Sequence, residues 1–185
     1  MTFIETERLR LRQWEEKDLP FFIAMNQDPR VMHFFPKLLT AEESAEFMER
    51  HKKAIDEQGF GLFACALKDT DECIGFVGLS KPSFEAHFTP CVEIGWRLRS
   101  EHHGKGYATE AARAVLKFGF EKVGLDEIVS FTVPMNIKSR RVMEKIGMMH
   151  NSADDFAHPK LAPGDWLSRH VLYRISKRQW QESSK

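Results

Sequence analysis

The stretch of sequence that decides the fold is VEIGWRL at residues 92–98, followed after five residues by GKGYATEA at residues 104–111. The first segment is typical of a strand, and the second is typical of an alanine-rich helix. Two glycines, Gly104 and Gly106, stand in the turn between them, where they permit positive φ and let backbone N–H groups converge on a ligand. Because the first turn of a helix also has unsatisfied N–H groups and the positive end of the helix dipole, this turn predicts an anion site suited to a pyrophosphate.

A glycine pair before a helix is a weak signal when it stands alone, since an ordinary loop-to-helix turn has the same sequence. The chain lacks the Gly-Lys-Ser or Gly-Lys-Thr spacing of a nucleotide hydrolase. It also lacks the third glycine and the acidic residue of a dinucleotide-binding fingerprint. The remainder of the chain therefore has to decide what the turn binds.

The flanking sequence predicts strands before the turn and a strand–helix–strand–helix unit after it. We expect strands at residues 9–12, 60–67, 73–79, 91–98, 127–133, 148–150 and 170–175. We expect helices at residues 17–28, 41–58, 107–123 and 137–146, the second of which begins at a capping box formed by Thr40 and Glu43. Residues 29–36 predict a packed loop or cleft wall, and residues 151–168 predict an irregular loop. This order is typical of an α/β protein of the α+β type, with helices packed on a mixed sheet.

The composition is that of an ordinary globular protein, with 42% hydrophobic and 29% charged residues. The 185 residues fit a single domain, 1–185. Lysine plus arginine (27) equal aspartate plus glutamate (27), so no global charge attracts nucleic acid or an acidic membrane. No apolar run approaches the roughly 20 residues that cross a bilayer, and no cleavable leader is recognisable. We therefore expect no nucleic-acid partner, no membrane partner and, by default, a cytoplasmic location.

The cysteines and histidines do not predict a metal site. Cys65, Cys73 and Cys91 match no closely spaced ligand pattern. Cys65 and Cys91 lie in or beside strand-like runs, where a cysteine is expected to be a small buried hydrophobic residue. The side chains of His102 and His103 diverge because the residues are adjacent, and no carboxylate pattern accompanies them.

Several segments resemble one known family in the family's own order. GKGYATEA at residues 104–111 looks like the acetyl-CoA pyrophosphate loop of the GNAT acetyltransferases. NIKSRRVMEKIGM at residues 136–148 is similar to the N-x-x-S-x-x-V-x-E-K-x-G-[FM] element of that family. TERLRLR at residues 6–12 and the closing strand around Tyr173 look like the branch named for the ribosomal-protein alanine acetyltransferases RimJ and RimL. Two motifs in the correct order and separation are much more specific than either motif alone.

The resemblance implies the GNAT fold, a mixed and mostly antiparallel sheet with helices on both faces. The sheet is expected to splay open between the strands Cys91–Leu98 and Glu127–Val133. The pantetheine arm of acetyl-CoA would enter that gap and pair with free backbone groups of the first strand. The residues expected to bind acetyl-CoA are Ile94, Trp96, Leu98, His102, His103, Gly104, Lys105, Gly106, Tyr107, Ala108 and Asn136.

The chain departs from the family pattern at three positions. Glu101 stands where the family often has Gln or Arg, and its carboxylate is expected to face solvent rather than the pyrophosphate. His103 stands where this branch commonly has Trp. Met143 stands where the family often has a Tyr that protonates the leaving thiolate, and a thioether cannot donate a proton.

Two residues are the candidate catalytic groups. An alkylamine is largely protonated near neutral pH, since the reference pKa of lysine is about 10.4, so a general base can help, often through water. Glu93 is the candidate base because its side chain points to the opposite face of the strand from Ile94. A structural or substrate-orienting carboxylate is the alternative. Ser139 is the candidate hydrogen-bond donor to the leaving thiolate, with a local helix hydrogen bond as the alternative. Asn136 suits both the pantetheine arm and a helix N-cap.

The resemblance thus implies an acyltransferase that moves an acetyl group from acetyl-CoA to a primary amine by direct attack in a ternary complex. The acceptor would be a protein or peptide N-terminal α-amine or a small-molecule amine, bound by a monomer or a homodimer. It is expected to contact residues 26–40, 81–90 and 151–169, with Phe34, His158 and Trp166 as candidate wall residues. The alternative is a non-catalytic acyl-CoA-binding or sensing module, which the replacement at Met143 keeps open.

Overall fold

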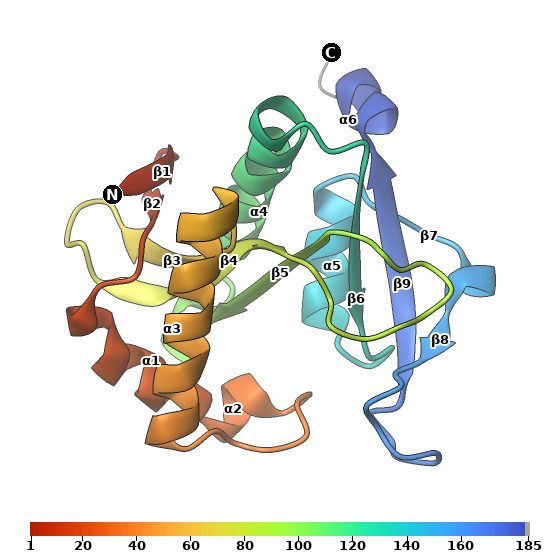
Figure 1. Ribbon diagram of the computed structural model, residues 1–185, viewed down its shortest axis with the longest axis horizontal. Helices are drawn as coiled ribbons and strands as arrows, with labels where there is room; N and C mark the ends of the chain where they lie inside the picture. Colours follow the sequence, from red (N-terminus) through yellow and green to blue (C-terminus); the bar gives the residue numbers. More distant parts are fainter. Residues whose placement is uncertain (184–185) are drawn as a thin grey trace.

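A computed structural model describes residues 1–183 and contains a mixed sheet of nine strands (Figure 1). Eight strands follow the order β1-β2-β3-β4-β5-β6-β9-β7, and β8 pairs with β9. Every neighbouring pair is antiparallel except β5 and β6, which run parallel. The bounds are β1 Thr2–Glu5, β2 Leu9–Arg12, β3 Leu62–Leu67, β4 Cys73–Ser80, β5 Glu93–Leu98, β6 Glu127–Thr132, β7 Met149–His150, β8 Phe156–Ala157 and β9 Arg169–Ser176.

Helices cover both faces of this sheet (Figure 1). Phe47 of α3 packs against Phe76 of β4 on one face, while the buried alanines of α4 join the core on the other. The predicted capping box is present, since the Thr40 hydroxyl accepts from the Glu43 N–H at 3.1 Å. The helices are α1 Leu19–Asn26, α2 Pro29–Met32, α3 Ala41–Gln58, α4 Tyr107–Phe118, α5 Ile137–Lys145 and α6 Lys177–Ser183.

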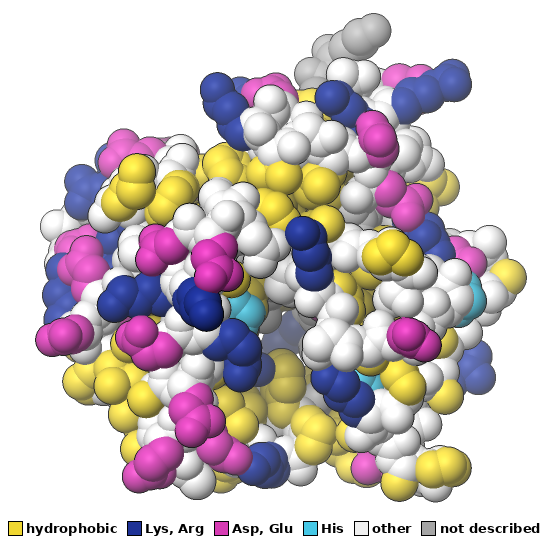
Figure 2. Space-filling view, viewed as in Figure 1, with side chains coloured by type: hydrophobic (Ala, Val, Ile, Leu, Met, Phe, Trp, Pro, Cys, Tyr) yellow, Lys and Arg dark blue, Asp and Glu magenta, His cyan; other side chains and the backbone are white. Residues whose placement is uncertain are grey.

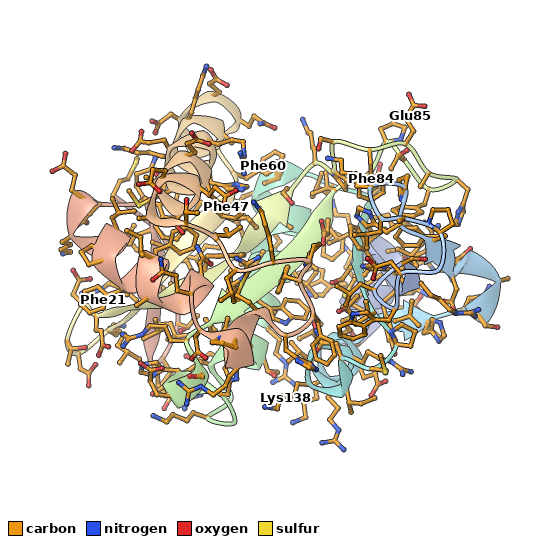
Figure 3. The ribbon with its side chains drawn as sticks, turned by 90° about the horizontal axis from the view of Figure 1, so that it is seen from below. Phe21, Phe47, Phe60, Phe84, Glu85 and Lys138 are labelled. Carbon is orange, nitrogen blue, oxygen red and sulfur yellow. The ribbon has the colours of Figure 1, made fainter. Side chains whose placement is uncertain are left out.

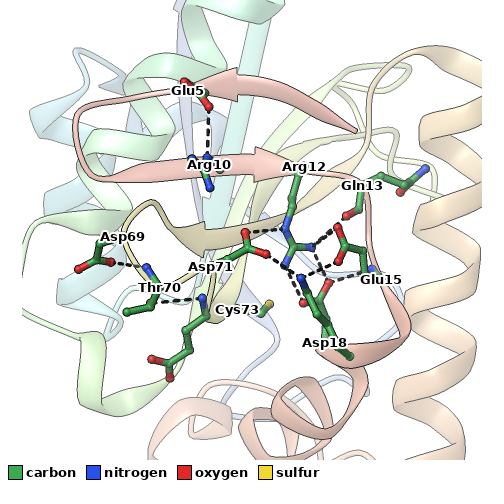
Figure 4. Close-up of polar contacts among 12 residues, drawn as sticks. Glu5, Arg10, Arg12, Gln13, Glu15, Asp18, Asp69, Thr70, Asp71 and Cys73 are labelled. Atoms are coloured by element: carbon green, nitrogen blue, oxygen red, sulfur yellow. Dashed lines mark hydrogen bonds and ion pairs between the residues drawn. The ribbon is translucent and has the colours of Figure 1, made fainter.

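A buried ion pair joins β2 to the start of α1 (Figure 4). The Arg12 guanidinium donates to both carboxylate oxygens of Asp18, at 2.7 and 2.9 Å, and both side chains are buried. Asp71, from the turn between β3 and β4, bonds Arg12 at 3.4 Å and Lys17 at 2.7 Å. Removing one partner of such a pair leaves an uncompensated buried charge, which typically costs several kcal/mol. The network therefore fixes the N-terminal strands to the helical layer.

The sheet divides between β5 and β6. β4 pairs with β5 along its whole length, from Ser80 opposite Glu93 to Gly75 opposite Leu98. On the other side, β5 pairs with β6 only where Glu93 lies opposite Val129, and the Val129 N–H donates to the Val92 carbonyl at 3.0 Å. One residue further along β6, the Ser130 hydroxyl bonds the Ile94 carbonyl at 2.9 Å, and the strands then separate. The predicted splay of the sheet is confirmed.

Some elements differ from the sequence-based expectation. β1, β8 and α6 are not among the predicted elements. β1 is a short strand at the edge of the sheet, β8 has only two residues, and α6 has almost no apolar periodicity. Residues 29–32 form the one-turn helix α2 where a loop was expected. The predicted helix 107–123 ends as an α-helix at Phe118 and continues as a π-turn from Gly119 to Val123.

Cys65 and Cys73 are buried, whereas Cys91 keeps partial exposure. Across residues 1–183, no helix is both long and apolar enough to span a bilayer.

Candidate active site

The open edge of β5 presents backbone groups towards the gap. The carbonyls of Val92 and Ile94 point towards β6, as their bonds to Val129 and Ser130 show. Because backbone groups alternate sides along a strand, those of Trp96 and Leu98 face the same way. No strand pairs with them there in the described chain. An extended ligand with amide groups can pair with this edge.

The turn after β5 has the conformation that an anion site needs. Gly104 (φ 76°) and Gly106 (φ 83°) both adopt the left-handed region, which favours glycine. Gly106 is the N-cap of α4, and no side chain of the described residues caps the N–H groups of the first turn. These donors from Tyr107 and Ala108 remain available to a ligand, together with the positive end of the helix dipole.

The connection between β1 and β2 holds this turn through polar contacts that the sequence did not reveal. Glu110, on the first turn of α4, accepts hydrogen bonds from the Thr6 hydroxyl at 2.6 Å and the Arg8 N–H at 2.9 Å. The Arg8 guanidinium bonds the same carboxylate at 2.7 Å and the Lys105 carbonyl at 3.0 Å, and it lies 4.5 Å from the centre of the Tyr107 ring. We call these contacts the Arg8–Glu110 clamp. They connect residues 6–8 directly to the predicted pyrophosphate turn.

The two adjacent histidines of the turn have different surroundings. His102 is buried, and its Nδ1 has no hydrogen-bond partner among the described residues. Burial lowers the pKa of His102, which favours the neutral ring. The His103 ring bonds the Leu98 carbonyl at 2.8 Å through Nε2. Glu101 is exposed and pairs with Arg99, as expected of a carboxylate facing solvent. Within the described chain, no three His, Cys, Asp or Glu side chains are grouped to hold a metal.

Glu93 lies at the point where the sheet opens. Its side chain is partly buried, and its carboxylate has no hydrogen bond or ion pair with any residue that the structure describes. Burial raises the pKa of Glu93 to about 8. Gly95, two residues along the same face, leaves open space beside the carboxylate, since a Cβ there would lie 4.0 Å from Oε1. An unpaired carboxylate with this pKa suits a general base.

Arg97 shares the face of Glu93 but is already paired. Its Nη1 donates to the Asn26 side-chain oxygen at 2.7 Å, and the guanidinium lies 4.0 Å from the centre of the Phe35 ring. Burial lowers the pKa of Arg97 to about 10. Sequence analysis missed this residue, although the alternation Glu93-Gly95-Arg97 could have placed its side chain beside Glu93. The contact fixes the segment after α2 over β5.

The second motif supplies the start of α5. Asn136 is the N-cap, and its side-chain oxygen accepts from the Ser139 N–H at 3.3 Å, while its amide donates to the Thr132 hydroxyl at 3.0 Å. The Ser139 hydroxyl has no partner among residues 1–183, so the local helix bond considered above is absent. Met143 is buried and packs in the core. The guanidinium of Arg113, another potential phosphate ligand, instead bonds the Lys145 carbonyl.

Aromatic rings gather on the C-terminal side of the gap. Phe131 of β6 lies two residues after Val129, the partner of Glu93, and therefore on the same face of the sheet. Phe84 contacts Phe131 at 5.7 Å and His158 at 4.6 Å between ring centres. We call the following set the aromatic wall: Phe84, Phe88, Phe131, Phe156, His158 and His170.

The part of the molecule before the gap (β1 to β5 with α1 to α3) and the part after it (β6 to β9) also contact each other through aromatic rings. Trp166, from the loop between β8 and β9, lies 5.8 Å from His33 and 6.3 Å from Phe34, which follow α2. Figure 2 shows the surface hollowed between the halves, with hydrophobic and basic side chains at the rim. The structure thus brings the expected wall residues Phe34 and Trp166 together, with His158 in the aromatic wall.

Comparison with known proteins agrees with this architecture. The sequence pattern of the family described as "Acetyltransferase (GNAT) domain" matches residues 8–149. The uncharacterized N-acetyltransferase YnaD of Bacillus subtilis is 33% identical over 177 residues, covering 96% of this chain and 98% of the relative. The crystal structure of a GNAT-family acetyltransferase from Bacillus anthracis superposes with a TM-score of 0.79 at 32% identity, covering 95% of this chain and 99% of that chain.

A more distant structure shares the fold alone. Spermidine N-acetyltransferase from Vibrio cholerae, solved with CoA and spermine, has a TM-score of 0.73 at 20% identity, covering 95% of this chain and 99% of that chain. Identity at this level carries the fold and not the acceptor.

Proposed function

Because this chain belongs to the GNAT acetyltransferase family and is an acetyltransferase, we propose that it transfers the acetyl group of acetyl-CoA to a primary amine by direct attack. The observation that carries this proposal is the unpaired Glu93 carboxylate at the open edge of β5. It stands where an extended thioester on β5 and an amine from the opposite face of the sheet would meet. A sensing module needs no such base, and the relatives named as N-acetyltransferases do not favour one.

Acetyl-CoA is proposed to lie across the opening of the sheet. Its pantetheine amides pair with the backbone of Ile94, Trp96 and Leu98. The carbonyls of Ile94 and Leu98 already bond Ser130 and His103, and each keeps a second lone pair for a ligand amide. Its pyrophosphate accepts from the backbone N–H groups at the start of α4, in the turn formed by His102, His103, Gly104, Lys105, Gly106, Tyr107 and Ala108. The left-handed glycines and the uncapped first turn support this placement.

The reaction requires proton transfers at both ends. The neutral amine attacks the thioester carbonyl, the N–C bond forms, and the C–S bond breaks as its electron pair passes to sulfur. Glu93 takes the proton of the amine, directly or through water. With a pKa of about 8, the Glu93 carboxylate is a stronger base than that of an ordinary glutamate. Its pKa is also closer to that of an alkylammonium group, which makes the proton transfer less unfavourable.

Ser139 and Asn136 are proposed to serve the leaving group and the pantetheine arm. The Ser139 hydroxyl, which has no partner in the described chain, donates a hydrogen bond to the leaving thiolate. Asn136 already caps α5, and the second lone pair of its side-chain oxygen can also accept from a pantetheine amide. Met143 is buried and has no proton to donate, and Ser139 carries the one hydroxyl group of α5.

The finer placement is also a proposal. The motif at residues 6–12 supports the branch of RimJ and RimL, and in this chain it contains the clamp residue Arg8. We further propose that residues 1–185 work as one domain in the cytoplasm, as a monomer or homodimer.

The test is thiol release from acetyl-CoA with a panel of amines, using wild type, Glu93→Gln and Ser139→Ala. Release should rise with at least one amine class. Glu93→Gln should lower kcat about 10²-fold and Ser139→Ala about tenfold, with the Kd of acetyl-CoA unchanged. Asn136→Ala is the contrasting variant, because its expected effect is on stability rather than on kcat alone. Loss of the N-cap should lower the free energy of unfolding by ~1 kcal/mol. Failure of the wild-type protein to bind acetyl-CoA would overturn the proposal.

A further inference from the structure

We infer that the acceptor is an apolar amine carrying an aromatic group, such as an arylalkylamine, rather than a polyamine. This inference rests on the proposed function and names the acceptor class of the same site. It comes from the aromatic wall beside Glu93 and from the charges of the three segments that surround the opening.

The aromatic wall is next to the proposed base. Glu93 lies opposite Val129, and Phe131 follows two residues later on the same face. Only Phe88 of the aromatic wall is buried, and the other five rings keep partial exposure. The centres of Phe84 and His158 lie 4.6 Å apart, and those of His158 and His170 lie 5.1 Å apart. Burial lowers the pKa of both histidines, so these rings are neutral near pH 7. Such a surface favours stacking with a flat apolar group.

The same surroundings disfavour a second ammonium group. Residues 26–40, 81–90 and 151–169 contain five carboxylates. Asp28 pairs with Arg30, Asp154 with Arg174, and Asp155 with His150 and Arg169.

The remaining two carboxylates, Asp165 and Glu85, are not placed to face a bound amine in the same way as Glu93, because one has a local backbone bond and the other is exposed. Asp165 accepts from the Leu167 N–H at 2.9 Å, and Glu85 points away from the sheet while its neighbour Phe84 faces the C-terminal strands (Figure 3). Lys160 bonds Ser83, beside Phe84, and adds a positive charge at the rim. Glu93 is therefore the one partly buried carboxylate of this opening that has neither a hydrogen bond nor an ion pair among the described residues, and a polyamine would leave its further charges without a partner beside the aromatic wall.

The experiment compares phenethylamine, n-hexylamine and spermidine as acceptors. For wild type, kcat/KM for phenethylamine should exceed that for spermidine by at least about tenfold. Phe84→Leu keeps an apolar side chain but removes the ring, and it should lower the ratio of kcat/KM for phenethylamine to that for hexylamine about 3- to 10-fold. The ratio is measured on one preparation, so partial loss of folded protein cancels.

Phe21→Leu is the matched control, because Phe21 is a partly exposed ring on α1, on the other half of the molecule (Figure 3). It should leave the ratio unchanged. Equal or greater kcat/KM for spermidine, or an unchanged ratio in Phe84→Leu, would overturn the inference while leaving the transferase proposal intact.

A second measurement covers the case in which no amine turns over. Calorimetric titration of CoA-loaded protein should show tighter binding of phenethylamine than of spermidine. Absence of phenethylamine binding, or tighter binding of spermidine, would overturn the inference. Stimulated thiol release and acetyl-CoA binding test the transferase proposal separately.

Discussion

At the scale of single residues, Glu93 combines two opposing requirements. Burial without a cationic partner favours its neutral form, whereas proton abstraction requires the ionised form. An incoming amine resolves this opposition, because the ammonium group is itself a partner for the carboxylate. The residue is therefore costly to the free protein at high pH and useful only in the complex.

This cost predicts a pH-dependent stability difference between wild type and Glu93→Gln. The folded pKa of about 8 exceeds the ordinary value of 4.5, so the folded state binds the extra proton and loses stability as the pH rises between these values. The unfolding free energy of Glu93→Gln should gain on wild type by up to ~1.4 kcal/mol per pH unit there. Urea unfolding from pH 5 to pH 8 measures it.

Glu85→Gln, at an exposed carboxylate, is the matched control and should show no such trend. A constant difference between wild type and Glu93→Gln at every pH would contradict the pKa assigned to Glu93.

At the scale of elements, the turn before α4 depends on the connection between β1 and β2, near the N-terminus. The Arg8–Glu110 clamp joins residues 6–8 to the first turn of the helix and to the Lys105 carbonyl. Left-handed glycines make a turn permissive rather than rigid, so the clamp supplies the restraint. Preorganisation of this kind lowers the cost of ordering the turn when acetyl-CoA binds.

Arg8→Gln should therefore weaken acetyl-CoA binding about 3- to 10-fold, with kcat at saturation little changed. Isothermal titration measures the Kd, and steady-state kinetics separates KM from kcat. Arg10→Gln is the control, since Arg10 lies two residues away, on β2, but pairs with Glu5 instead. Equal Kd values for the two variants would show that the clamp has no part in binding.

At the scale of the whole molecule, two halves share β5. The N-terminal half pairs with it along its length, and the C-terminal half meets it at Glu93 and Val129, with the added bond from Ser130. A ligand that pairs with the free edge would contact both halves. Binding would therefore stabilise the junction as well as the folded state.

Acetyl-CoA at 100 times its Kd should raise the unfolding free energy by ~2.7 kcal/mol. Hydrogen exchange should slow at the amides of Trp96 and Leu98, which face the gap, and stay unchanged in β1 at the far edge. If exchange slowed only in β1, or did not slow at all in β5, the proposed pairing of pantetheine with β5 would be contradicted.

The sequence was sufficient for the order of the main elements and the splay of the sheet, because the motifs at residues 104–111 and 136–148 are specific. It could not reveal the Arg8–Glu110 clamp or the pairing of Arg97 with Asn26, since both join residues more than 70 positions apart. The aromatic wall was also hidden, because its members come from separate loops and strands. Their assembly depends on tertiary packing, which local patterns do not encode.

The separation of the two ligand surfaces along the chain has an evolutionary consequence. The groups proposed for acetyl-CoA lie in β5, in the turn after it and at the start of α5, whereas the aromatic wall belongs to loops or to strands across the gap. Loops tolerate exchange far better than the elements that they connect. Grafting residues 81–90 and 151–169 from a relative should therefore change which amines are accepted while leaving the acetyl-CoA site unchanged. Acceptor specificity can thus diverge quickly among close paralogues.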